Sequence, residues 1–144
     1  MIIKQISIFV ENKKGRLAEI TETIAKSGAN IRALSIADTT DFGILRLIVD
    51  KVDCAVAALK ESGITVSVTN VIAIGIEDKP GAFSVPMRIL SEADIDVEYM
   101  YAFITRKSEK AYVILRVADN EAAAKVLIEK GVEILDEEKL LSLM

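Results

Sequence analysis

The chain has 144 residues, of which 51% are hydrophobic, and it carries a formal net charge of −4. This length suits one ordinary domain or two very small ones, and the longest apolar runs, such as residues 71–76, are far too short to cross a bilayer. The acidic balance opposes contact with a phosphate backbone, so nucleic acid is not expected as a partner, and the absence of histidine removes the commonest general base and metal ligand.

The first predicted elements are a strand and a helix. Ile6, Ile8 and Val10 alternate with Gln5, Ser7 and Phe9, which is the period-two pattern of a strand with one face more buried. Leu17, Ile20 and Ile24 follow at spacings of three and four, which places them on one face of a helix of about three turns. Gly28 stands where such a helix commonly stops.

A hairpin and a second helix come next. Residues 30–38 and 43–50 are rich in branched side chains and predict two antiparallel strands. Asp53 is expected to cap the following helix and Gly63 to end it. A last strand at 64–71 completes the order β-α-β-β-α-β and runs into the next part of the chain.

The second half of the chain repeats this order. The stretch ENKKGRL at 11–17 returns as EDKPGAF at 77–83, and the chain is therefore predicted to contain two units, residues 1–69 and 70–144. The elements expected in the second unit are a strand at 71–76, a helix at about 82–93 with Pro86 in its first turn, strands at 95–104 and 110–118, and a helix at 120–130.

The predicted fold class is α+β, with two ferredoxin-like βαββαβ units that each place two helices on one face of an antiparallel sheet. The strand at 43–49 is apolar on both faces, so its second face should be covered, either by the other unit in a pseudo-twofold tandem pair or by a homodimer. Residues 136–144 predict a short amphipathic helix capped by Asp136, with leucines that cover the core.

The repeated loop has the chemistry of a small binding site. Gly15 permits a tight turn before a helix, and the first helical N–H groups lack intrahelical partners and attract anionic oxygens. Asn12 offers both a donor and an acceptor, which suits a zwitterion. The competing interpretation is that Gly15 only turns the chain and Asn12 caps the helix. Asn30, at the start of the next strand, is expected to converge on Asn12 and so favours the binding site.

These residues resemble those of the ACT domain, a small-molecule-binding regulatory module attached to many amino-acid biosynthetic enzymes. The resemblance rests on a strand that ends in acidic–Asn/Asp–Lys–x–Gly–x–apolar and on Asn-Ile or Asp-Val after one helix, and it covers essentially the whole chain as two tandem units. In that family, amino acids typically bind where two ACT units meet, between the strand-to-helix loop of one unit and residues of its neighbour.

The resemblance implies a set of ligand-binding residues in each copy. They are Asn12, Gly15, Arg16, Leu17, Asn30 and Ile31 in the first copy, and Asp78, Gly81, Ala82, Phe83 and Asp96 in the second. The carboxylates of Asp78 and Asp96 depart from the amide version of the pattern. They cannot donate to a ligand carboxylate, although they can hold an ammonium group.

The function implied by the resemblance is a non-catalytic sensor of a free amino acid that regulates an unidentified partner, without a cofactor or a metal, and as a homodimer. The alternative is a ligand-free interaction module. An RNA-recognition module would need a basic surface beside the aromatic residues Tyr99, Tyr101 and Phe103. A small enzyme would need a nucleophile and a base, and no such pair can be named.

The start of the chain predicts a cellular location, and the single cysteine predicts a packing role. Residues 1–12 lack the apolar core and cleavage site of a signal peptide, so the expected location is the cytoplasm, without a membrane partner. Cys54 is the only cysteine and cannot form an internal disulfide, so it is expected to be a small, partly buried filler near the start of a helix.

Overall fold

A computed structural model describes residues 2–38 and 41–144, and its contacts divide the chain into two units. The N-terminal unit consists of residues 4–69. The C-terminal unit consists of residues 70–144 together with the first residues of the chain. The long strand β4 (Val66–Glu77) starts in the N-terminal unit and ends in the C-terminal unit, as expected from the strand that runs into the second copy.

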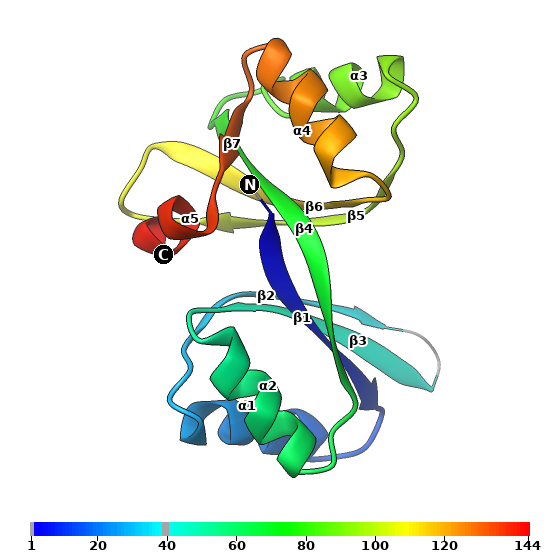
Figure 1. The fold of residues 1–144 in the computed structure, drawn as a ribbon, viewed down its shortest axis with the longest axis vertical. Helices are drawn as coiled ribbons and strands as arrows, with labels where there is room; N and C mark the ends of the chain where they lie inside the picture. Colours follow the sequence, from blue (N-terminus) through cyan, green and yellow to red (C-terminus); the bar gives the residue numbers. More distant parts are fainter. Residues whose placement is uncertain (1, 39–40) are drawn as a thin grey trace. The chain divides into compact units, whose positions relative to one another are not determined.

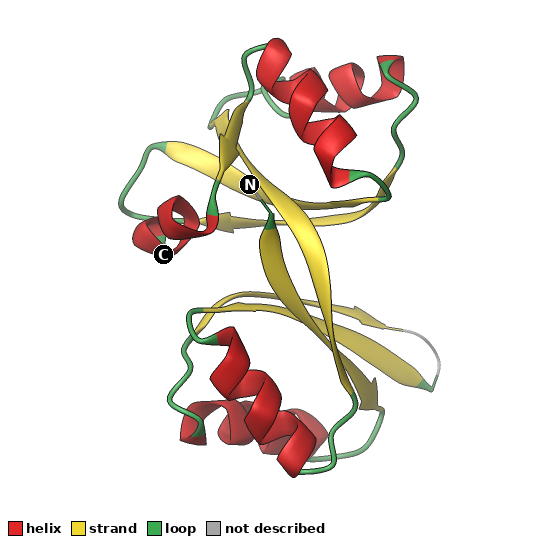
Figure 2. Ribbon diagram, in the orientation of Figure 1, coloured by secondary structure: helices red, strands yellow, loops and turns green. Residues whose placement is uncertain are grey.

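The N-terminal unit has the predicted βαββαβ order, with both helices on one face of the sheet (Figures 1 and 2). Its strands lie in the order β2-β3-β1-β4, and β3 runs antiparallel to both β1 and β2. The elements before β4 are β1 (Ile3–Glu11), α1 (Arg16–Lys26), β2 (Ile31–Asp38), β3 (Phe42–Val49) and α2 (Val52–Glu61).

The core of the N-terminal unit lies between the sheet and the two helices. The alternate residues Ile6, Ile8 and Val10 of β1 are at most 5% exposed, as the period-two pattern predicts. Phe9 lies on the other face of the strand and is 47% exposed. The buried β1 residues pack with members of the other elements, including Ile20, Ile24, Leu45, Leu47, Ala55 and Leu59.

The start of α2 differs from the prediction. The helix begins at Val52, with Lys51 at the N-cap and no side-chain cap hydrogen bond among the described residues. Asp53 therefore lies in the first turn, where its charge faces the positive end of the helix dipole, rather than at the cap. The partly buried position expected for Cys54 is also wrong, because α2 buries Val52 and Ala55 and leaves Cys54 exposed.

The C-terminal unit repeats the βαββαβ order and adds one helix. The second part of β4 pairs with β6 on one side and with β7 on the other, and β5 pairs with β6, all antiparallel. Pro86 lies in the first turn of α3, as predicted. The elements after β4 are α3 (Ser84–Glu92), β5 (Val97–Ile104), β6 (Lys110–Val117), α4 (Asn120–Glu129), β7 (Glu133–Leu135) and α5 (Glu137–Leu143).

The added helix α5 is the amphipathic tail that the sequence predicts. Asp136 caps it by accepting a hydrogen bond from the Lys139 backbone N–H at 2.7 Å, and Leu140 and Leu143 are buried. The Thr105 hydroxyl donates to the carbonyl oxygen of Leu143. This bond ties the end of α5 to the connection between β5 and β6.

Candidate functional site

The loop between β1 and α1 makes a tight reversal at Gly15. Gly15 has φ +84°, a left-handed conformation that favours glycine, and it occupies the N-cap of α1. The Arg16 N–H is satisfied by the Lys13 carbonyl at 3.2 Å. Gly15 has no side chain with which to cap the helix, and no other side-chain cap is found in the described part of the chain. The next first-turn N–H groups, beginning with that of Leu17, can therefore serve an external acceptor.

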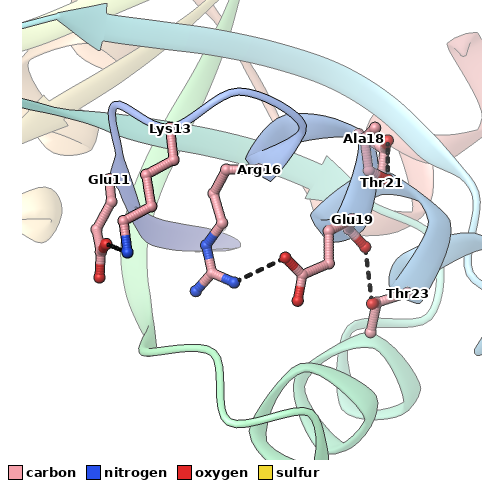
Figure 3. A network of polar contacts seen from close by, with 7 residues as sticks. All are labelled: Glu11, Lys13, Arg16, Ala18, Glu19, Thr21 and Thr23. Atoms are coloured by element: carbon pink, nitrogen blue, oxygen red, sulfur yellow. Dashed lines mark hydrogen bonds and ion pairs between the residues drawn. The ribbon is translucent and has the colours of Figure 1, made fainter.

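Charged side chains surround this loop in two ion pairs. Lys13 Nζ lies 2.7 Å from Glu11 Oε2, and Arg16 Nη1 lies 3.0 Å from Glu19 Oε2 (Figure 3). The hydrogen bond and the charge of Lys13, with a further contribution from Arg16, hold the pKa of the Glu11 carboxyl below its ordinary value of 4.5. These groups line a polar hollow of about 320 Å³ that Gly15 and Lys14 complete.

A second hollow, of about 270 Å³, opens on the sheet side of the same loop. The polar groups of its rim come from the loop and from Asp38 at the end of β2, whereas its wall is apolar. Leu17 and Ile36 are 46% and 48% exposed, so both present apolar surface to solvent. The residues that line this hollow, here called the loop pocket, are Val10, Glu11, Asn12, Lys13, Leu17, Ile36, Asp38, Phe42 and Gly43.

Gly43 brings the edge strand close to the loop pocket. It pairs with Val10 of β1 and with Asp38 of β2. A Cβ atom at Gly43 would come within 3.1 Å of the Ala37 carbonyl oxygen and 3.5 Å of Ile36 Cδ1. The glycine thus permits β2 to approach β3 closely at the end of the sheet where the loop pocket lies.

The predicted convergence of Asn30 on Asn12 is wrong within the unit. The Asn12 backbone N–H donates to the Asp41 carbonyl at 3.2 Å, just before β3 begins. The Asn30 backbone N–H donates to Asp50 Oδ1 at 2.8 Å, just after β3 ends. The two asparagines therefore lie at opposite ends of β3. Ile31, next to Asn30, packs against the core of the N-terminal unit.

The helix that follows the corresponding loop of the C-terminal unit begins differently from α1. Gly81 repeats the left-handed conformation with φ +85°, but α3 begins only at Ser84, whose N–H and hydroxyl both donate to the Gly81 carbonyl at 3.2 and 2.7 Å. Pro86 is the third helical residue and has no N–H to offer. Phe83, the counterpart of Leu17, packs against the core instead of standing free.

The remaining predicted ligand-binding residues of the C-terminal unit also lie at two different ends of their sheet. Asp78 is exposed in the loop beside Ala82, which is half-buried. Asp96 precedes β5, whose first residue pairs with Val117 at the end of β6. Glu77, the last residue of β4, pairs with Lys110 at the start of β6. Asp78 and Asp96 are therefore at opposite ends of this sheet as well.

Five residues of the loop pocket lie outside the loop motif, namely Val10, which directly precedes it, and Ile36, Asp38, Phe42 and Gly43. The directions of the strands could have indicated the residues from β2 and β3. Because β1 and β2 are both antiparallel to β3, they run parallel to each other. Their ends must then meet at one end of the sheet, and the end of β2 carries Asp38, whereas its start carries Asn30.

The described helices include none that is long and apolar enough to span a membrane. Within residues 2–38 and 41–144, no group of three or more His, Cys, Asp or Glu side chains is placed to hold a metal ion.

Comparisons with known proteins follow the same division into two similar halves. A family model described as "ACT domain pair" matches residues 1–144. The solved structure of protein BT0572 from Bacteroides thetaiotaomicron is 42% identical over 99% of this chain and 98% of that one, with a TM-score of 0.92. The ligand-free regulatory subunit of aspartate kinase from Thermus thermophilus is 17% identical over 89% of this chain and 92% of that one, with a TM-score of 0.62, and thus shares the fold. No protein with curated annotation matches the chain.

Proposed function

The chain belongs to the ACT domain pair family, and from this premise we propose that it is a non-catalytic sensor that binds a free amino acid at the loop pocket of its N-terminal unit. The observation that carries the proposal is the pocket itself, in which the amide of Asn12, the carboxylate of Asp38 and apolar side chains line one small volume that Leu17 joins to the uncapped start of α1. An α-amino acid needs this combination of partners.

The charged ends of the ligand fit opposite sides of the pocket. Its carboxylate would accept hydrogen bonds from the first-turn N–H groups near Leu17 and from the Asn12 amide, supported by the helix dipole. Its ammonium group would lie at Asp38. In this proposal Asp38, and not Asn30, is the polar residue of β2 that converges on Asn12 within the unit.

The side chain of the ligand would meet an apolar wall. Leu17, Ile36 and Phe42 supply that wall, and all three line the loop pocket. A pocket of about 270 Å³ suits a small to medium apolar side chain better than a long charged one. We therefore propose a free amino acid with an apolar side chain as the ligand.

The residues at the far end of each sheet can contribute only from a different unit. Asn30 and Ile31, like Asp96, can touch a ligand held by a strand-to-helix loop if that loop belongs to an ACT unit of a second copy in a homodimer. The loop of the C-terminal unit, with Asp78, Gly81, Ala82 and Phe83, remains a second proposed site. Its Asp78 would hold an ammonium group rather than a carboxylate.

The regulated partner is proposed to be a protein of amino-acid metabolism in the cytoplasm. The fold is shared with a regulatory subunit of aspartate kinase, a protein whose name indicates control of an enzyme. Ligand binding would change the shape or assembly of the sensor, and the partner would respond to that change.

A thermal-shift screen against the free amino acids tests the proposal. A ligand at a hundredfold excess over its dissociation constant stabilises the folded state by about 3 kcal/mol, which raises Tm by several degrees. Asp38→Asn should remove most of that shift, whereas Asp53→Asn, the same change on the exposed face of α2, should retain it. The absence of a shift with every amino acid, or an equal shift in both variants, would contradict the proposal.

A ligand-free interaction module remains the second candidate, and one observation favours it. The edge strand β2 exposes Leu34 at 58% and Ile36 at 48%, which is an apolar edge suited to another protein. This candidate predicts stable oligomers that are lost when Leu34 is replaced. It also predicts that amino acids leave Tm unchanged.

A further inference from the structure

The C-terminal unit has a hollow of about 330 Å³ at the end of β4. It lies between the last residues of β4, the start of α3 and the start of β7. Its charged lining consists of Glu77, Lys79, Lys110 and Glu133, and its apolar lining includes Val85 and Pro86. Of the loop residues proposed above as ligand-binding, only Ala82 lines it.

Gly75 creates the space in which the charged groups of this hollow meet. It pairs with Tyr112 on one side and with Glu133 on the other. Its counterpart in the N-terminal unit is Phe9, whose ring stacks on Phe42 with centroids 4.3 Å apart. The C-terminal unit replaces this aromatic pair by Gly75 and Lys110, so that an apolar contact gives way to a charged surface.

The Glu133 carboxylate occupies part of that space. A Cβ atom on Gly75 would collide with Glu133 Oε1 and would come within 3.2 Å of Tyr112 Cε1. The Glu133 carboxylate thus lies against Gly75, in the space that a side chain at this position would fill. Any side chain at this position would force the carboxylate outward, because it is the flexible end of a long side chain.

Glu133 has one oxygen without a hydrogen-bond partner. Oε1 is buried and finds no donor among the described residues. Oε2 is 3.5 Å from Lys110 Nζ, which is a long ion pair. The other carboxylate, that of Glu77, is already paired with Lys79 at 2.6 Å. Glu133 is therefore the acceptor in the hollow that a new donor would satisfy.

We propose that this hollow binds a small primary ammonium group, with Glu133 as its acceptor and with Val85 and Pro86 against its alkyl part. The carboxylate can turn about its last bond, which is a soft torsion, and so present the unsatisfied oxygen to the ligand. Lys110, held only loosely by Glu133, is free to pair with an acid group of the same ligand. A simple amine and an apolar amino acid share the ammonium chemistry that this site recognises.

An NMR titration of the whole protein tests the site. Isobutylamine, valine and isobutyric acid share one branched alkyl group and carry an amine, both groups and an acid, respectively. Isobutylamine, added up to about 50 mM to cover millimolar affinities, should shift the backbone amide signals of Gly75, Gly131 and Glu133 saturably. Isobutyric acid should not shift them. Tighter binding of valine than of isobutylamine would identify an amino acid as the natural class, and equal or weaker binding would identify an amine.

Two variants of the hollow and one control variant distinguish binding in the hollow from unspecific binding of the amine elsewhere on the protein. Glu133→Gln should weaken isobutylamine binding at least tenfold, and Gly75→Ala should do the same by displacing the carboxylate. Glu129→Gln, an exposed residue of α4, should leave it unchanged. Unsaturable shifts, or equal binding by the wild type and Glu133→Gln, would overturn the proposal. The signals of Gly15 and Gly43 report separately on the loop pocket, so failure of one site is distinguishable from failure of the other.

Discussion

Asn30 and Asp50 are joined by two hydrogen bonds, from the Asn30 backbone N–H to Asp50 Oδ1 at 2.8 Å and from the Asp50 backbone N–H to the Asn30 carbonyl at 3.2 Å. They tie the start of β2 to the end of β3. The Asp50 side chain thus has a structural partner at the end of the sheet away from the loop pocket. Stability and ligand binding are therefore separable at the two ends of this unit.

Asp50→Ala should lower the free energy of unfolding by about 1 kcal/mol, because the Asn30 N–H loses its acceptor. Asp50→Asn retains an oxygen in the same place and should recover most of that loss. Urea denaturation of the three proteins measures the effect. Equal losses in both variants would show that the charge of Asp50 matters and not the hydrogen bond.

Gly15→Ala should destabilise the fold by about 1 kcal/mol and also weaken the response to the amino acid. The cost arises from the left-handed backbone, since an added Cβ would meet nothing within 4 Å. Gly28 has φ +85° and equally open surroundings, but it lies at the far end of α1. Gly28→Ala should therefore cost as much stability in urea and leave the thermal shift by ligand intact. A normal ligand response in Gly15→Ala would remove this loop from the site.

Leu17→Ala should weaken amino-acid binding while it changes the free energy of unfolding by no more than about 0.5 kcal/mol, because the side chain is half exposed. Leu34→Ala is the matched control, since Leu34 is exposed on β2 and does not line the loop pocket. Isothermal titration calorimetry compares the two variants. The interaction-module alternative predicts the reverse, namely loss of oligomers in Leu34→Ala and no effect of Leu17→Ala.

The ion pair between Glu11 and Lys13 should be visible in the pH titration of Glu11. Its folded-state pKa lies below the ordinary value of 4.5, first through the hydrogen bond from Lys13. The pair therefore contributes stability above that value, and the contribution is lost as the pH falls through the lowered pKa. Carbon-detected NMR of the carboxyl group should show the pKa return toward 4.5 in Lys13→Met. An unchanged titration in that variant would contradict the assignment.

The repeat and the alternation of apolar residues were sufficient to predict the order of elements in both units. Gly15, Gly81 and the capped tail helix also followed from the sequence, because each depends on local backbone chemistry. The start of α2 did not follow from the sequence, because the helix already begins at Val52, one residue before Asp53. The exposure of Cys54 did not follow either, because the helix buries Val52 and Ala55 and turns Cys54 outward.

The candidate site was predicted only in part because it depends on strand register. The loop motif named Asn12 and Leu17, which line the loop pocket, and Gly15, which lines the neighbouring polar hollow, and these positions need only the local turn. Asp38 and Gly43 join them through the pairing of β2 and β1 with β3, which is a long-range relationship. The expected approach of Asn30 to Asn12 neglected the direction of the strands, because the start of β2 lies at the end of the sheet opposite to the end of β1.

Binding of a free amino acid in the loop pocket can be measured by ¹⁵N-resolved NMR of the wild-type protein with each free amino acid in turn. We expect at least one apolar amino acid to shift the Gly15 and Gly43 amide signals saturably and to leave those of Gly28 and Gly63 in place. If none of them moves the Gly15 and Gly43 signals at concentrations up to about 10 mM, the loop pocket is not an amino-acid site.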